Sequence, residues 1–336
     1  ASLTSFLINF ERFLLTKTKM EKNEITLFCV NDGKNHKIES GQDLKALSDR
    51  FYSSVTDQKT GQKFDVLAAL VDNKLKELSF KPANLHQVEF IGYNHPDGRR
   101  SYVRSLCFVL QNAVRELYPD KVLVIDHSLP SGLYCEIVEK AKNEDGRNKA
   151  YFVTDDEIDR IREKMRDIVA KDLPFSKVKM FSEEAEALFI ANNQPQKAEL
   201  QKSLGTFSCS VYYLDGNADT FHGPLIPSTG YLKVFDISGM GDGFCLQSPM
   251  MTDFNKVMPM KRQGKISAAL KEYSDWCSII NIGSIGTLNK AVKDGKAVSI
   301  INLAESLHER NYARIADRIY TERGTKRIVM IAGPSS

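Results

Sequence analysis

The amino-acid sequence predicts an α+β protein of several domains, from its length, its composition and the order of its strand and helix patterns. The 336 residues are 42% hydrophobic and 26% charged, which is ordinary for a globular protein. Because a domain usually holds ~100–200 residues, two or three domains are expected. The patterns divide the chain into an N-terminal extension, a small first domain, a larger second domain, a helical connector and the start of a further domain, at residues 1–20, 21–93, 94–250, 251–326 and 327–336.

Composition excludes several classes of protein. No apolar run reaches the ~18–20 residues that span a bilayer, and a net charge of +3 is too small to indicate nucleic acid or a membrane surface. The six cysteines are scattered without zinc-ligand spacing, and most lie in apolar runs, which predicts free thiols in the cytoplasm. The apolar N-terminal stretch is too short, and too soon followed by Glu11 and Arg12, to be a secretory signal.

The first domain, residues 21–93, reads as a small β-grasp fold. Two short strands flank the turn signal Asn31–Gly33, which is typical of a hairpin. Leu44, Leu47 and Phe51 recur at helical spacing, so one helix follows the hairpin. The strands are expected at Glu24–Val30, His36–Glu39, Val66–Val71 and Gln87–Ile91.

The second domain, residues 94–250, mixes helices with strands. Apolar residues from Val103 to Leu117 share one helical face until Pro119 ends it, and Thr154–Glu157 is a capping box that opens another helix. Strands are expected at Lys121–Ile125, Gly132–Val138, Phe207–Leu214 and Tyr231–Ile237. From about residue 253 the pattern is helical, and it ends in a long helix from about Leu303 to Arg323.

The last ten residues read as a buried strand, Arg327–Ile331, that enters a phosphate-binding loop. Gly333, Pro334, Ser335 and Ser336 match the first four positions of the pattern G-x-x-x-x-G-K-[ST]. The alternative is a short apolar strand with a polar tail. The second Gly, the Lys and the Mg²⁺-binding hydroxyl are not among these residues, so the segment is expected to hold no cofactor and to have no kinase activity.

Three stretches of the chain resemble threonyl-tRNA synthetases, which begin with a TGS domain and a domain that hydrolyses mischarged seryl-tRNA. The stretches are Leu106–Pro119, Ser131–Glu136 and His222–Pro227. The resemblance implies that the second domain has the fold of that editing domain. However, Arg104, Phe108, Phe221 and Leu225 stand where the family carries two His of H-x-x-x-H and a later Cys and His. Phe and Leu neither ligate a metal nor transfer a proton, so editing is not expected.

A second resemblance extends to the end of the chain. Some bacterial ATP-dependent uridine kinases of the phosphoribulokinase/uridine kinase group begin like threonyl-tRNA synthetase and continue through a helical connector into a P-loop kinase domain. The matching stretches are His127–Ile137, Ile226–Lys233, Glu305–Glu309 with Arg314–Asp317, and Ile331–Ser336. This resemblance implies an accessory region whose partner is the kinase domain that follows it. The full-length enzyme would then use ATP and Mg²⁺ to phosphorylate a nucleoside 5′-hydroxyl.

The altered editing pocket is the candidate site. The guanidinium of Arg104 needs an anionic partner if it is buried, which indicates a small anionic ligand or a nucleotide. The favoured alternative is a surface Arg that pairs with a nearby acid or points to water. Side chains that could line the same pocket are those of Phe108, His127, Tyr134, Phe221, His222, Leu225 and Lys233. Each has a structural alternative, such as His127 as a turn residue. An RNA- or nucleotide-binding module without a kinase remains open, although the basic residues are few for RNA. The sequence predicts no metal site and leaves the oligomeric state open.

Overall fold

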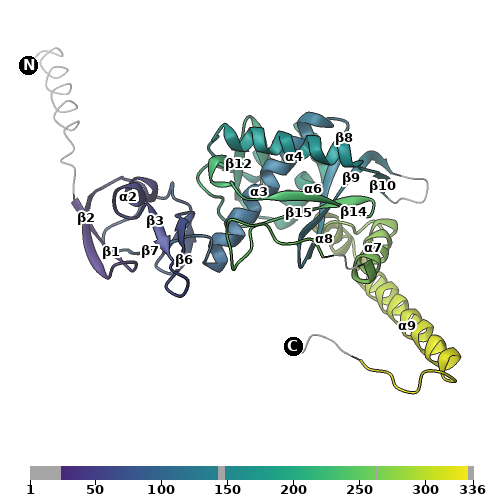
Figure 1. Cartoon of the computed structure of the whole chain (residues 1–336). Helices are drawn as coiled ribbons and strands as arrows, with labels where there is room; N and C mark the ends of the chain where they lie inside the picture. The colour runs from purple at the N-terminus through teal and green to yellow at the C-terminus, as the bar shows by residue number, and fades with distance from the viewer. Residues whose placement is uncertain (1–23, 143–147, 262–263, 332–336) are drawn as a thin grey trace, which may run out of the picture. The chain divides into compact units, whose positions relative to one another are not determined.

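The computed structural model describes residues 24–142, 148–261 and 264–331, and Figure 1 gives the course of the whole chain. The chain forms two compact units. The first contains the described residues up to Phe181 together with Phe207–Asp275, and the second contains Ser182–Thr206 together with the described residues from Trp276 onward. Along the chain, some strands and helices follow one another in separate runs and others alternate, so the predicted α+β class is confirmed.

The first unit begins with a mixed five-stranded sheet of order β2-β1-β7-β5-β6, in which β1 and β7 are parallel. Helix α2 (Leu44–Phe51) packs on this sheet and is capped by Asp43, whose side chain accepts a hydrogen bond from the Ala46 N–H. Leu44 and Leu47 pack with the sheet residues in a small core of their own. The strands are β1 (Glu24–Cys29), β2 (Lys34–Glu39), β5 (Ala68–Val71), β6 (Lys74–Lys76) and β7 (Gln87–Ile91), with a separate pair β3 (Ser54–Thr56) and β4 (Lys63–Asp65).

The larger core of the first unit surrounds helix α3 (Pro96–Leu117). Pro96 at the first helical position and the His95 cap start α3 about two turns before Val103, where the apolar periodicity begins. Helix α4 (Asp155–Ala170) begins at the predicted capping box, in which Thr154 and Glu157 bond reciprocally. The second sheet has the order β10-β9-β15-β14 with β8 on β9. Its strands are β8 (Lys121–Leu129), β9 (Gly132–Lys142), β10 (Asn148–Tyr151), β14 (Asp236–Met240) and β15 (Gly243–Gln247).

A third sheet, of order β11-β12-β13, lies in the same unit. It contains β11 (Ser176–Phe181), β12 (Ser208–Leu214) and β13 (Asn217–Asp219). β11 and β12 are antiparallel, and the register places Lys177 opposite Tyr212. Side chains at directly opposed positions share one face of a sheet, so these two are neighbours.

Aromatic packing joins the first sheet to the α3 core. Tyr93, Tyr102 and Phe254 meet with ring centroids 4.9–5.9 Å apart, and Phe64 adds an edge contact to Phe254 at 5.6 Å. The Tyr93 hydroxyl donates to the Pro249 carbonyl at 2.8 Å, which satisfies its one polar group inside the cluster.

The segment Ser228–Gly230 is held in place by hydrogen bonds inside the first unit. Thr229 is fully buried, and its hydroxyl donates to the Ile168 carbonyl and accepts from the Leu173 N–H, both at 2.9 Å. The predicted strand Tyr231–Ile237 is wrong for most of its length, because β14 begins only at Asp236. The hydroxyl of Tyr102 bonds the N–H and C=O of Val234, in place of a neighbouring strand.

The second unit is helical. It contains α5 (Ser182–Ala191), α6 (Pro195–Leu204), α8 (Ile285–Lys293) and α9 (Ala297–Glu322), while α7 (Gly264–Ile279) runs across the boundary between the units. α6 packs closely on α8, where a Cβ atom at Gly286 would lie 2.8 Å from the backbone nitrogen of Leu200. Among the described helices, none combines the length and apolar character needed to cross a membrane.

The predicted buried strand at Arg327–Ile331 is wrong. These residues are irregular, and Ile328 and Ile331 are 81% and 96% exposed. A strand needs a partner for its backbone groups, and no strand within the described residues pairs with this segment. The predicted loop start at Gly333, Pro334, Ser335 and Ser336 lies outside the described residues.

Candidate functional site

Helix α3 presents Arg104 and Phe108 one turn apart on the same face. The loop after β13 brings Phe221 and Leu225 against that face. The structure therefore brings together the four positions at which the resemblance predicts the functional groups of the editing family. What these four side chains do there decides whether catalysis is possible.

Three of the four side chains fill the space with hydrocarbon. Phe108 is 0% exposed and Leu225 is 2% exposed. The ring of Phe108 lies 5.2 Å from that of Phe221 and 6.0 Å from that of Phe175. These positions thus form an aromatic and aliphatic cluster, whose side chains can neither ligate a metal nor transfer a proton. Within the part of the chain that the structure describes, no group of three or more potential ligands could hold a metal ion.

Arg104 is a structural side chain in this arrangement. Its Nε and Nη2 donate to the Pro224 carbonyl at 3.2 and 3.0 Å, and Nη2 also lies 3.1 Å from the Ser101 hydroxyl. Desolvation lowers the pKa of the half-buried guanidinium. These hydrogen bonds go to a carbonyl and a hydroxyl, whereas the sequence favoured a surface Arg that pairs with an acid or points to water.

Gly223 permits this contact with Arg104. Its φ is +123°, a conformation that L side chains rarely adopt, and a Cβ atom there would lie 3.0 Å from the Arg104 Cζ. The glycine therefore lets the loop backbone approach the guanidinium face.

The other predicted site residues lie elsewhere. His127 is on β8, with Nδ1 2.8 Å from the Asp126 carboxylate and its ring stacked on Tyr134 at 5.0 Å. Tyr134 donates to Glu136 at 2.8 Å and lines a different cavity, next to the β14–β15 turn. His222 is exposed, and the exposed Lys233 forms a 3.3 Å ion pair with Asp65.

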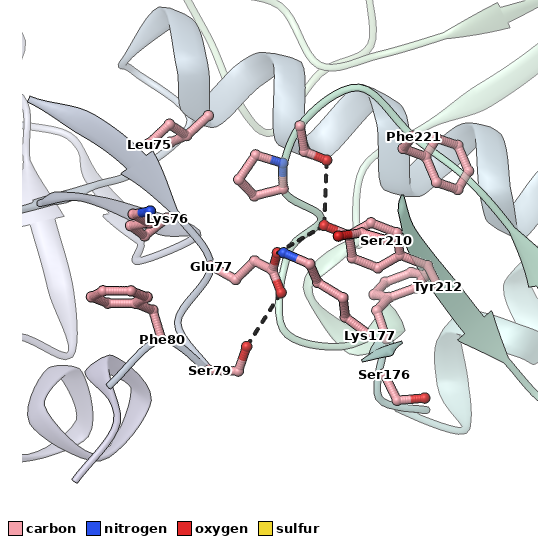
Figure 2. A pocket seen from close by; sticks show the side chains of 13 residues that line it. Leu75, Lys76, Glu77, Ser79, Phe80, Ser176, Lys177, Ser210, Tyr212 and Phe221 are labelled. Atoms are coloured by element: carbon pink, nitrogen blue, oxygen red, sulfur yellow. Dashed lines mark hydrogen bonds and ion pairs between the residues drawn. The ribbon is translucent and has the colours of Figure 1, made fainter. Parts of the chain in front are cut away.

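An open pocket of about 560 Å³ lies beside the aromatic cluster (Figure 2). We call it the Glu77 pocket. Its wall combines the segment that follows β6 with β11, β12 and the loop of Phe221; the residues used below are Lys76, Glu77, Phe80, Lys177, Tyr212 and Phe221. Only Phe221 among these was a predicted site residue, because residues from such distant parts of the sequence carry no joint signal.

The Glu77 segment is held in place by helix α2. The backbone N–H groups of Leu44 and Lys45 donate to the carbonyls of Phe80 and Leu78, at 2.9 and 2.7 Å. Leu78, which is 2% exposed, anchors the segment in the small core. Glu77 is therefore presented to the pocket by backbone that is itself fixed.

The carboxylate of Glu77 is the centre of the polar network shown in Figure 2. Tyr212 donates its hydroxyl to Glu77 Oε1 at 2.8 Å, Ser79 donates to Oε2 at 3.3 Å, and the Lys177 ammonium forms an ion pair with Oε1. Burial, and then the negative charge of Glu77 and the hydrogen bond to it, raise the pKa of the Tyr212 hydroxyl. The phenol therefore stays protonated and serves as a donor.

The sequence is similar to the threonine–tRNA ligases of several bacteria. It is 27% identical to that of Rubrobacter xylanophilus over 236 residues, which cover 69% of this chain and 34% of that protein. It is 26% identical to that of Clostridium kluyveri over 216 residues, 64% of this chain and 31% of that protein. It is 29% identical to that of Desulforamulus reducens over 182 residues, which cover 54% of this chain and 27% of that protein. No family model matches the chain.

These matches identify a threonyl-tRNA-synthetase-like region in the chain. The chain spans about a third of the length of the Rubrobacter xylanophilus and Clostridium kluyveri relatives. The comparison therefore concerns this region, and the activity of those ligases is not transferred with it.

Proposed function

We propose that this chain is a non-catalytic accessory region, built on a synthetase-type editing fold, that binds a ligand and regulates an attached enzyme. The observation that carries the proposal is the replacement of the editing groups. Phe108, Phe221 and Leu225 pack together as hydrocarbon, and Arg104 is bound to a backbone carbonyl. With no nucleophile, base or metal ligand at these positions, hydrolysis of an aminoacyl ester has no chemical means there.

We further propose that the attached enzyme is an ATP-dependent uridine kinase. The support is the ordered resemblance of the motif stretches, from His127–Ile137 to Ile331–Ser336, to such kinases. ATP and Mg²⁺ would bind in the kinase domain, where a complete P-loop supplies backbone N–H groups, a Lys and a hydroxyl to the phosphates and the metal. That domain would be the main partner of this region.

A nucleotide- or RNA-binding module without a kinase is the second candidate. The Glu77 pocket favours it, because the pocket combines aromatic side chains with lysines. On this reading the fold is the same and the pocket is the functional site, whatever follows the chain.

Two assays test these proposals. The purified chain, incubated with seryl-tRNA, should release serine no faster than buffer does; enzymatic release would overturn the loss of editing. The full-length gene product should convert uridine and Mg-ATP to uridine 5′-monophosphate, detected by mass spectrometry. Failure of that conversion, with the protein folded and the gene reading through Ser336, would reject the kinase and leave the binding module.

A further inference from the structure

We propose that the Glu77 pocket binds a free mononucleotide, with its phosphate on Lys177 and its base against the aromatic wall. This inference deepens the proposed function, since it names the ligand of the accessory region. The volume of about 560 Å³ lies within the ~300–1,000 Å³ that is usual for small-molecule sites.

The aromatic side chains supply flat apolar surface. Phe80 and Phe221 line opposite parts of the wall, and both are only partly buried. A planar heteroaromatic ring can stack on such surface whatever its identity, because every base has a π-face. Aliphatic ligands would gain contact area there but no stacking.

The charges of the wall favour an anion. The wall contains two ammonium groups, those of Lys76 and Lys177, and one carboxylate, that of Glu77, so its three charged side chains sum to +1. The ammonium of Lys76 lies over the Phe80 ring, 4.9 Å from its centre, which places a positive charge against one face of that ring. A phosphate group joined to a planar base matches this combination of charge and flat surface.

Glu77 acts as an internal competitor for the phosphate. Its carboxylate holds Lys177 in the ligand-free pocket, while Tyr212 and Ser79 also donate to it. When a phosphate binds Lys177, Glu77 keeps the Tyr212 and Ser79 hydrogen bonds, so the carboxylate is not left without partners. Removal of the carboxylate charge should therefore strengthen phosphate binding, whereas removal of the ammonium should weaken it.

The two opposite signs define the experiment. Isothermal titration of the purified chain, in low-salt buffer without Mg²⁺, would use uridine 5′-monophosphate and adenosine 5′-monophosphate as probes. We expect at least one of them to bind, Lys177→Ala to weaken its binding roughly tenfold, and Glu77→Gln to tighten it several-fold. Lys37→Ala, which changes an exposed lysine of β2 outside the wall, is the matched control and should bind as the unmodified chain does.

The Glu77→Gln variant also guards against unfolding as an explanation, because a damaged pocket cannot bind more tightly. Absence of binding for both probes would overturn the proposal. Equal affinity in the Lys177→Ala and Glu77→Gln variants would do the same. Stronger competition by a single-stranded RNA than by the mononucleotides would assign the pocket to RNA instead.

The kinase assay keeps the two proposals separate. Mononucleotide binding by the chain, together with a full-length product that fails to phosphorylate uridine, would support this site and reject the kinase. The reverse result, phosphorylation without binding in the chain, would reject this site alone.

Discussion

Replacement of Phe108 by Ala tests the claim that hydrocarbon has taken the place of the editing groups. Phe108 is 0% exposed, so the full side chain is lost from the core. Phe→Ala substitutions in cores cost about 3–5 kcal/mol, since the transfer free energy is lost and a cavity remains. The rings of Phe221 and Phe175 lose their partner as well, and aromatic pairs contribute about 0.5–1.5 kcal/mol beyond the buried area. We therefore expect a loss of about 4 kcal/mol in the free energy of unfolding.

Urea unfolding followed by far-UV circular dichroism measures this change. The dependence of the unfolding free energy on urea must be equal in the compared proteins, because the chain has two units and the comparison requires the same transition. The matched control is Phe152→Ala, at a phenylalanine that is 64% exposed, where a change within about 0.5 kcal/mol is expected. A loss below about 1.5 kcal/mol for Phe108→Ala, or one equal to that of the control, would refute the packing argument.

Three further outcomes follow from individual side chains. Thr229→Val should lower the free energy of unfolding by about 1–3 kcal/mol in the same urea assay, because the Leu173 N–H loses its buried acceptor. An unchanged free energy of unfolding would contradict the structural role of Thr229. Partial burial alone would raise the pKa of Glu157, but hydrogen bonds from Tyr151 and Thr154 lower this pKa below the usual 4.5. The contribution of Glu157 to the stability of the fold is therefore complete above pH 4.5 and is lost as the pH falls through the lowered pKa. Thermal melts should then show a shallower acid slope for Glu157→Gln than for Glu163→Gln, an exposed control. Burial raises the pKa of the Cys107 thiol to about 12, so iodoacetamide at pH 8 should label Cys107 only after unfolding, as read by mass spectrometry.

Local signals in the sequence were sufficient for the elements they describe. The capping box at Thr154 and Glu157 predicted the start of α4, since both hydrogen bonds lie within four residues. The apolar face from Val103 to Leu117 predicted most of α3 for the same reason. The prediction of a strand at Arg327–Ile331 was wrong. Apolar residues indicate that burial is favourable, but they do not indicate which strand would pair with the segment and bury it.

The departure from the His and Cys that the resemblance predicts could be read from the sequence, because it depends only on the residue types at positions 104, 108, 221 and 225. Residue type alone already excludes ligation and proton transfer. The hydrogen-bond partner of Arg104 could not be predicted, since its acceptor is a backbone carbonyl, a group that every residue possesses.

The sequence by itself therefore determined the fold class and the start of α4 at its capping box. Only the tertiary structure decided which side chains share a pocket. Lys177 and Tyr212 lie 100 and 135 residues from Glu77 along the chain. The three side chains meet because the Glu77 segment lies beside the β11–β12 pair. Contacts of this range arise from packing that the whole unit shares, so no short stretch of sequence carries them.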